Sequence, residues 1–126
     1  MAKILIAEDE LDIRNLIAFT LRLAKHEVII TNNGADAWAK VQELAKNDDQ
    51  PDLILLDVRM PYMTGHEVCR NIKAEEKLQA IPVAFLSAKG QGAEIQEGLD
   101  VGAIEYIIKP FAPDQLTRKV EELLGR

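Results

Sequence analysis

The fold is indicated most directly by LILLDVRMPYMTG, residues 53–65. Its first four residues are apolar without interruption, which is typical of a strand buried on both faces of a parallel sheet. Asp57 comes immediately afterwards, and Pro61 and Gly65 then turn the chain away. Because ligands of parallel α/β proteins lie beyond the carboxyl ends of the strands, Asp57 is a candidate functional residue.

Short apolar runs on both sides of this stretch alternate with helical patterns. Strands are predicted over residues 3–7, 27–31, 53–56, 81–86 and 105–108. Helices are predicted over residues 10–25, around 37–45, after Gly65, over 91–101 and from Pro113 onward. Five strand–helix units predict an α/β fold, a doubly wound parallel sheet with helices on both faces. Gly92 and Gly98 predict that the helix over residues 91–101 is the least stable.

The composition limits the class of protein. The chain has 126 residues, which suits one domain over residues 1–126. Its net charge of −6 argues against direct binding to nucleic acid, whose phosphates attract basic surfaces. The single Cys69 excludes an internal disulfide, and no segment has the pattern of a signal peptide or a membrane span. We therefore expect a cytoplasmic protein with no membrane partner.

Charged and polar residues gather where the predicted strands end. Glu8 and Asp9 follow the first strand, Asp57 the third, Ser87 the fourth and Lys109 the fifth. If the first and third strands are neighbours, the carboxylates crowd together, and two carboxylates ~4 Å apart repel by about 4 kcal/mol at an effective dielectric constant of roughly 20. Mg²⁺ would offset this repulsion, with Mn²⁺ or Ca²⁺ less favoured. Such a cation, with Lys109 and Ser87, would stabilise the charge of a phosphoryl group.

Four motifs together resemble the receiver domain of bacterial response regulators, the CheY-like family. They are Glu8-Asp9, the pattern D-x-x-M-P-x-x-x-G from Asp57 to Gly65, Ser87-Ala88, and Lys109-Pro110-Phe111. Each lies at a predicted strand end, and the resemblance covers essentially the whole chain. It implies a flavodoxin-like (βα)5 fold with strand order 2-1-3-4-5 and a cis peptide bond before Pro110.

The resemblance also implies a phosphoryl-transfer function. Asp57 would take a phosphoryl group from a phosphohistidine of a sensor histidine kinase or phosphotransfer protein, or from a small acyl phosphate. Asp9 would bind Mg²⁺ directly and Glu8 mainly through water, while Asp57 and the backbone carbonyl of Arg59 would complete the protein ligands. Lys109 would pair with the phosphoryl oxygens. Such a domain is not a classical enzyme, although it catalyses its own phosphorylation and dephosphorylation.

A switch is implied as well. Ser87 would hydrogen-bond the attached phosphoryl group, and its movement would open a space into which Tyr106 turns. The surface of the helix over residues 91–101, the fifth strand and the closing helix would then change, bind a target protein and form the interface of any weak dimer. Arg59 and Lys89 occupy positions that tune dephosphorylation in this family. Two long cations there predict slow self-hydrolysis.

Each site residue also has a simpler structural interpretation. Asp57 could belong to a turn, Glu8 and Asp9 could cap the first helix, Lys109 could be a surface lysine, Ser87 a strand-end hydroxyl, and Tyr106 a half-buried packing residue.

Other functions remain as alternatives. Phosphatases of the haloacid dehalogenase family need a second aspartate two residues after the first, where this chain has Arg59. A pseudo-receiver that only binds partners usually lacks one of the acidic residues or the lysine, and all are present here. A nucleotide-binding protein is disfavoured, because neither of the glycine-rich motifs G-x-x-x-x-G-K-[ST] and G-x-G-x-x-G occurs. Because the sequence ends after the fifth predicted helix, we expect a stand-alone receiver or a fragment of a longer regulator.

Overall fold

The computed structural model describes residues 2–88, 102 and 105–125. It contains a five-stranded parallel sheet in the order β2-β1-β3-β4-β5, which confirms the predicted doubly wound fold and its strand order. The strands are β1 (Lys3–Ala7), β2 (Glu27–Thr31), β3 (Leu53–Asp57), β4 (Val83–Ala88) and β5 (Glu105–Lys109). The described helices are α1 (Leu11–Leu23), α2 (Gly34–Lys46), α3 (Gly65–Ala74) and α5 (Pro113–Leu123).

Most element boundaries agree with those predicted. β1 and β2 match residue for residue, and β3 and β5 each extend one residue further, to Asp57 and Lys109. β4 begins at Val83 rather than at residue 81, because Pro82 has no N–H to donate to the sheet, and it ends at Ala88 rather than at residue 86. α1 is shorter than predicted by one residue at its start and two at its end. The helix predicted over residues 91–101 lies outside the described residues.

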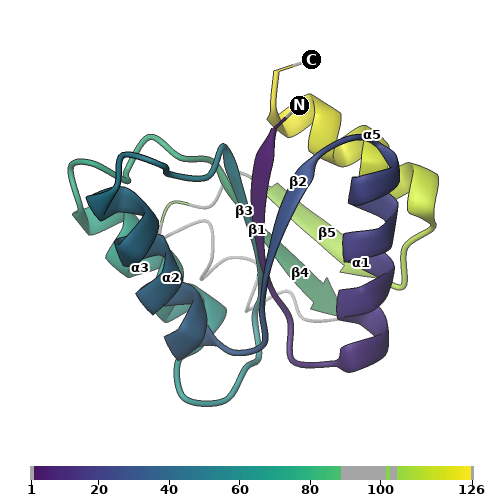
Figure 1. The fold of residues 1–126 in the computed structure, drawn as a ribbon. Coiled ribbons are helices and arrows are strands. Elements are labelled where there is room, and N and C mark those ends of the chain that lie inside the picture. Colours follow the sequence, from purple (N-terminus) through teal and green to yellow (C-terminus); the bar gives the residue numbers. More distant parts are fainter. Residues whose placement is uncertain (1, 89–101, 103–104, 126) are drawn as a thin grey trace.

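The sheet is the middle of three layers. α1 and α5 cover one face, and α2 and α3 cover the other (Figure 1). In β3, Ile54 and Leu56 pack on the α2–α3 side, whereas Leu53 and Leu55 pack on the α1–α5 side, and all four are fully buried. This two-sided burial explains the uninterrupted apolar run. None of the helices in the described part of the chain has the length and apolar character needed to cross a membrane.

Two glycines hold the loop between β3 and α3 in place. A Cβ atom at Gly34 would overlap the backbone carbonyl of Met63, and one at Gly65 would overlap the backbone carbonyl of Asp57. Any side chain at these positions would force the backbone apart. α3 begins directly after Thr64, which forms a capping box with Glu67. The close contacts of Gly34 with Met63 and of Gly65 with Asp57 therefore fix the path of the chain between β3 and α3.

Candidate functional site

The carboxyl ends of the strands bring the predicted site residues to one edge of the sheet. Asp57 and Lys109 are the last residues of β3 and β5, and Glu8 and Asp9 follow β1 directly. Ser87 is the residue before the last in β4. Because all neighbouring strands are parallel, these ends lie side by side. The sheet thus gathers side chains that lie far apart in the sequence.

Three carboxylates form the centre of this site. One ligand atom each from Glu8, Asp9 and Asp57 lies within 4.8 Å of the others. The Glu8 side chain is fully buried and Asp57 is 7% exposed, whereas Asp9 faces solvent. The crowding expected from neighbouring first and third strands is therefore present. The exposed Asp9 leaves the cluster open to ions and small solutes.

Lys109 places a positive charge between two of the carboxylates. Its Nζ lies 2.7 Å from Oε1 of Glu8 and 3.3 Å from Oδ1 of Asp57. Burial acts to lower the pKa of Lys109, but the two nearby carboxylates raise it overall. Burial and the negative charge of Glu8 raise the pKa of Asp57 to about 8, against the opposing effect of Lys109. One lysine therefore does not neutralise the cluster.

The donor atoms of this site fit a hard divalent cation. Oε1 of Glu8 is buried and, within the described residues, has no well-directed hydrogen bond, although Lys109 Nζ is close to it. A buried carboxylate oxygen in this situation is unfavourable unless a cation or a donor completes its environment. Carboxylate oxygens that leave room for water suit Mg²⁺ and, less well, Mn²⁺. Glu8, Asp9 and Asp57 are the side chains that would hold the ion.

Residues outside the predicted set position the acidic pair. The backbone N–H of Glu8 donates to the carbonyl of Thr31 at 3.2 Å, and the Arg14 guanidinium donates to the carbonyl of Glu8 at 3.0 Å. Neither Thr31 nor Arg14 is indicated by the sequence, because no local spacing links either residue to Glu8. The nearest available signal was the position of Arg14 one turn into the predicted helix.

The start of α1 tests the capping interpretation of the acidic pair. The N-cap residue is Glu10, without a side-chain cap, so the alternative interpretation in which Asp9 caps this helix is wrong. Oε2 of Glu8 does accept the N–H of Glu10 at 3.2 Å. Glu8 therefore supports the helix start while its other oxygen faces Lys109, and Asp9 stays available at the rim.

The predicted switch residues lie beside the cluster. Ser87 is 1% exposed and pairs in register with Ile108 of β5. Tyr106 is half-buried, and its ring packs against Phe85 with 5.4 Å between ring centroids. Phe85 also meets the ring of His66 edge-on at 4.9 Å. This packing supports the structural interpretation of Tyr106. No local pattern in the sequence indicates the contact between His66 and Phe85, because it joins α3 to β4.

The two residues predicted to tune dephosphorylation are placed differently. Arg59 is exposed two residues after Asp57. Lys89 lies outside the described residues. The peptide bond between Lys109 and Pro110 is cis, as predicted.

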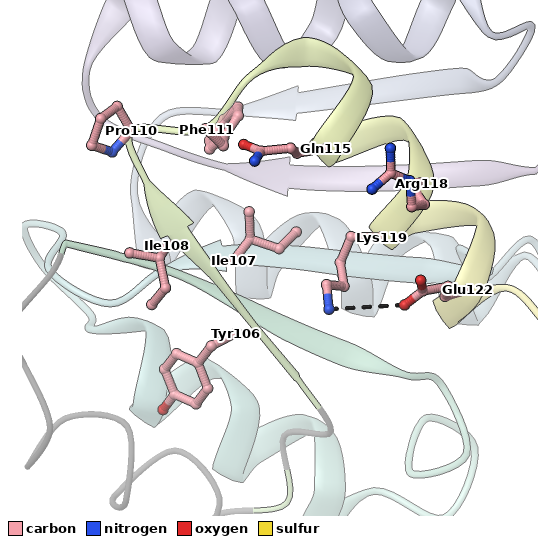
Figure 2. Close-up of a pocket in the computed structure, with 9 residues that line it drawn as sticks. All are labelled: Tyr106, Ile107, Ile108, Pro110, Phe111, Gln115, Arg118, Lys119 and Glu122. Carbon is pink, nitrogen blue, oxygen red and sulfur yellow. Dashed lines mark ion pairs between the residues drawn. The ribbon is translucent and has the colours of Figure 1, made fainter.

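A groove of about 470 Å³ runs along the edge formed by β5 and α5 (Figure 2). It is lined by Tyr106, Ile107, Ile108, Pro110, Phe111, Gln115, Arg118, Lys119 and Glu122. Lys119 forms ion pairs with Glu122 at 3.8 Å and with Glu105 at 3.1 Å. The groove therefore combines apolar side chains with charged side chains of α5, and it begins at Tyr106, a short distance along β5 from Lys109.

Comparison with known proteins agrees with this geometry. The family model "Response regulator receiver domain" matches residues 4–121. The phosphate regulon regulatory protein PhoB of Pseudomonas aeruginosa is 40% identical over 123 residues, which are 98% of this chain and 52% of PhoB. A CheY homologue of Campylobacter jejuni is 36% identical over 124 residues, which are 98% of this chain and 92% of that protein.

Solved structures show the same likeness. The chemotaxis response regulator CheY4 of Vibrio cholerae superimposes with a TM-score of 0.88 at 32% identity, covering 98% of each chain. The chain spans about half the length of PhoB and of several other curated relatives. With a family model that matches nearly the whole chain, and with the acidic cluster and the lysine at the expected strand ends, this protein belongs to the response regulator receiver domain family.

Proposed function

We propose that this chain is a phosphorylatable receiver that accepts a phosphoryl group on Asp57 in a Mg²⁺-dependent reaction. Receiver domains are signalling domains rather than classical enzymes, and they work with histidine kinases and downstream effectors. The single observation that carries the proposal is the cluster of Glu8, Asp9 and Asp57 within 4.8 Å, with Lys109 Nζ between two of the carboxylates.

The reaction uses Asp57 as the nucleophile. A carboxylate oxygen of Asp57 forms a bond to phosphorus while the bond from phosphorus to the donor histidine nitrogen breaks, and the freed imidazole keeps the electron pair of that bond and takes up a proton. The short turn from Asp57 to Gly65 holds the carboxylate at the rim. Lys109 remains beside Asp57 and pairs with the new phosphoryl oxygens. The same residues support return of the phosphoryl group to water.

Mg²⁺ supplies positive charge at the place where the phosphoryl group adds negative charge. Glu8, Asp9, Asp57 and the backbone carbonyl of Arg59 are the groups proposed to hold it. A cation near Asp57 also favours the ionised carboxylate, which is the nucleophilic form and is disfavoured by burial and by Glu8. An ion held by these groups would therefore favour the ionised form of Asp57 and would offset the negative charge that the phosphoryl group adds.

The output of the domain is a change at the β5–α5 edge. Ser87 is buried in β4 beside β5, where it can move toward an attached phosphoryl group. Tyr106 lies half-buried against Phe85 at the head of the groove in Figure 2, so a new position of its ring would alter that groove. A downstream protein would bind there, and a weak dimer would use the same edge. Arg59 and Lys89 are proposed to shield the aspartyl phosphate from water.

The biological setting follows from the family and the charge of the chain. The proposed donors are a sensor histidine kinase or a phosphotransfer protein in the cytoplasm, and the proposed target is a protein. A net charge of −6 disfavours direct contact of this domain with nucleic acid. We treat residues 1–126 as one receiver domain.

Intact mass spectrometry after incubation with acetyl phosphate and Mg²⁺ tests the proposal. The wild-type chain should gain the mass of one phosphoryl group, whereas Asp57→Asn, or the wild-type chain in excess chelator, should gain none. If acetyl phosphate does not phosphorylate the wild-type chain, a phosphorylated histidine kinase or phosphotransfer domain should be used as the phosphoryl donor. Failure with every donor would favour a pseudo-receiver that only binds partners. A short phosphoryl lifetime that Arg59→Ala and Lys89→Ala leave unchanged would contradict the shielding role.

A further inference from the structure

Three aromatic rings make a continuous series of contacts from α3 to β5. The ring of His66, in the first turn of α3, meets the Phe85 ring edge-on, with 4.9 Å between the ring centroids and 89° between the ring planes. Phe85 packs against Tyr106 at 5.4 Å and is also its partner in the register of β4 and β5. The Tyr106 ring lies on the face of the sheet that α2 and α3 cover, away from α5 (Figure 2). These contacts therefore join α3 to the proposed switch residue.

The middle ring of this series, Phe85, is held from two sides. Phe85 is fully buried and His66 is 5% exposed, whereas Tyr106 is half-buried at the edge of the sheet. The backbone of Gly65 also lies close to Phe85, since a Cβ atom at position 65 would be 3.2 Å from the Phe85 ring. Because protein interiors are close-packed, a displaced ring moves its neighbours. A shift of His66 therefore reaches the less confined Tyr106 ring through Phe85.

His66 differs in chemistry from the side chains that α3 buries after it, which are Val68, Cys69 and Ile72. Burial of an imidazole is less favourable than burial of an aliphatic side chain of similar size, so space-filling alone does not account for a histidine here. An aromatic ring supplies a preferred orientation as well, because the positive edge of one ring is attracted to the negative face of another. The edge-on geometry of His66 and Phe85 is therefore the property that an aliphatic side chain would not reproduce.

The first turn of α3 is also tied to the turn that follows Asp57. Gly65, the residue before His66, lies directly against the backbone carbonyl of Asp57, and its N–H closes the turn after β3. A displacement of Asp57 would therefore be transmitted through the backbone to His66 and from there to Phe85. This route differs from the one through Ser87, which lies on β4 and reaches β5 directly.

We propose that His66 is a positioning residue for the switch: its edge-on contact with Phe85 sets the resting position of the Tyr106 ring and couples that ring to the turn after Asp57. The coupling rests on the proposed phosphorylation of Asp57, whereas the resting position does not. An edge-on aromatic pair contributes enough to change the ratio of two ring positions by about twofold to tenfold. Loss of the His66 ring should therefore redistribute the Tyr106 ring while the sheet stays folded.

Fluorine NMR of the full chain labelled with fluorotyrosine tests the resting position. The sequence contains two tyrosines, and Tyr62, which is 86% exposed, gives a reference signal in the same spectrum that Tyr62→Phe assigns. The ring current of Phe85 makes the Tyr106 signal sensitive to the placement of these two rings. Without a phosphoryl donor, His66→Leu should shift the Tyr106 signal and leave the Tyr62 signal unchanged. His66→Phe, which restores an aromatic edge, should return the Tyr106 signal toward its wild-type position.

Ile72→Val is the matched control, because it alters another fully buried side chain, in the last turn of α3. It should lower the free energy of unfolding without moving the Tyr106 signal. Urea denaturation of each variant separates a general loss of stability from an effect on the ring. If His66→Leu does not fold, His66→Met takes its place, since the flexible methionine side chain adapts to irregular spaces in a core.

Addition of acetyl phosphate and Mg²⁺ tests the coupling to Asp57. Intact mass spectrometry should show equal phosphoryl uptake by the wild-type chain and by His66→Leu, because His66 is outside the carboxylate cluster. The Tyr106 signal should move on phosphorylation in the wild-type chain, and by less than about half as much in His66→Leu. Failure of both chains to take up a phosphoryl group would contradict the proposed function, whereas the spectra without a donor would still decide the positioning role.

Three results would each overturn the positioning role of His66. They are a Tyr106 signal that is the same in the wild-type chain and in His66→Leu, a shift of equal size in Ile72→Val, and a His66→Phe spectrum that does not return toward the wild-type position. A phosphorylation-dependent shift of equal size in the wild-type chain and in His66→Leu would overturn the coupling.

Discussion

Gly65 approaches Asp57 so closely that a methyl group at position 65 would overlap the backbone carbonyl oxygen of Asp57 and lie 3.2 Å from the Phe85 ring. The N–H of Gly65 also donates to the carbonyl of Val58 at 3.0 Å, which closes the turn that follows β3. The glycine therefore sets the position of the proposed phosphoryl acceptor through the backbone. Gly65 thus has a positioning role in addition to its place in the turn between β3 and α3.

Gly65→Ala should displace Asp57 and reduce phosphoryl transfer. The overlap is with backbone, which cannot rotate away, so we expect a loss of about 2–3 kcal/mol in the free energy of unfolding, typical of overpacking. Urea denaturation and the rate of phosphorylation by acetyl phosphate measure the two effects. Gly125→Ala is the control, because the added methyl group has no atom within 4 Å. Only the strain of the positive φ of 80° remains at that position, without steric overlap. Equal behaviour of the two variants would contradict the positioning role of Gly65.

Asp57→Asn should stabilise the metal-free protein at neutral and alkaline pH. The pKa of Asp57 is raised from 3.8 to about 8 in the folded state, so the folded chain holds this proton more tightly than the unfolded chain. The wild-type chain therefore loses stability as the pH rises from about 4 to about 8, whereas the asparagine variant does not lose this contribution. We expect the free energy of unfolding of Asp57→Asn to exceed that of the wild-type chain by about 2 kcal/mol at pH 8. This difference is smaller than the full effect of the pKa shift would give, because solvent at the rim screens the charge.

Urea denaturation with a chelator at several pH values between 4 and 9 measures this difference. Asp12→Asn, at an exposed position on α1, provides the comparison, because it removes a carboxylate without altering the charges at the strand ends. A stability difference for Asp57→Asn that does not grow between pH 5 and pH 8 would show that the carboxylate is not held in an unfavourable environment.

Asp9→Asn should separate metal binding from folding. Asp9 is exposed and does not cap α1, so its replacement should change the metal-free stability by less than about 0.5 kcal/mol. Mg²⁺ at ten times its dissociation constant should stabilise the wild-type chain by about 1.4 kcal/mol, and this gain should be lost in the variant. Thermal denaturation with and without Mg²⁺ measures it. An equal gain in both proteins would place the ion elsewhere.

Lys109→Gln should leave Glu8 and Asp57 without the cation that lies 2.7 Å and 3.3 Å from their oxygens. We expect metal-free stability to fall by about 2 kcal/mol at pH 8, with a smaller loss at pH 5, where Asp57 is protonated in the folded chain. Phosphorylation of Asp57 should be strongly slowed even with saturating Mg²⁺. Lys119→Gln is the control, because it removes a partly exposed lysine that pairs with Glu105, at the opposite end of β5 from Lys109. A pH-independent loss of stability would contradict this charge balance.

Tyr106→Ala should distinguish the packing role of this ring from its proposed role as a switch. The ring is half-buried against Phe85, so its removal should cost about 1–2 kcal/mol, less than truncation of a fully buried aromatic side chain. Phosphoryl uptake should be unchanged, because Tyr106 is outside the carboxylate cluster. Tyr106→Phe keeps the packing and should retain stability. If the switch proposal is correct, binding of the target should become less sensitive to phosphorylation in Tyr106→Ala.

The order of strands and helices could be predicted from the chain because it depends on local pattern. The apolar run at 53–56 is buried on both faces, and alternating strand and helix patterns have few ways to pack into a parallel sheet. The candidate site could be predicted too, because carboxyl ends of parallel strands share one edge, so Asp57 and Lys109 were identifiable from their places after apolar runs.

Other features depend on contacts between residues distant in the chain, which no local pattern encodes. The burial of the Glu8 carboxylate and the raised pKa of Asp57 arise only when β1, β3, β4 and β5 have assembled into one sheet and water is excluded from between these side chains. The close approach of Gly34 to Met63, and the contact of Phe85 with both His66 and Tyr106, likewise require α2, α3 and the sheet to be in place. Periodicity therefore predicts which face of an element is buried, whereas desolvation, steric overlap and charge balance depend on the distances that folding creates.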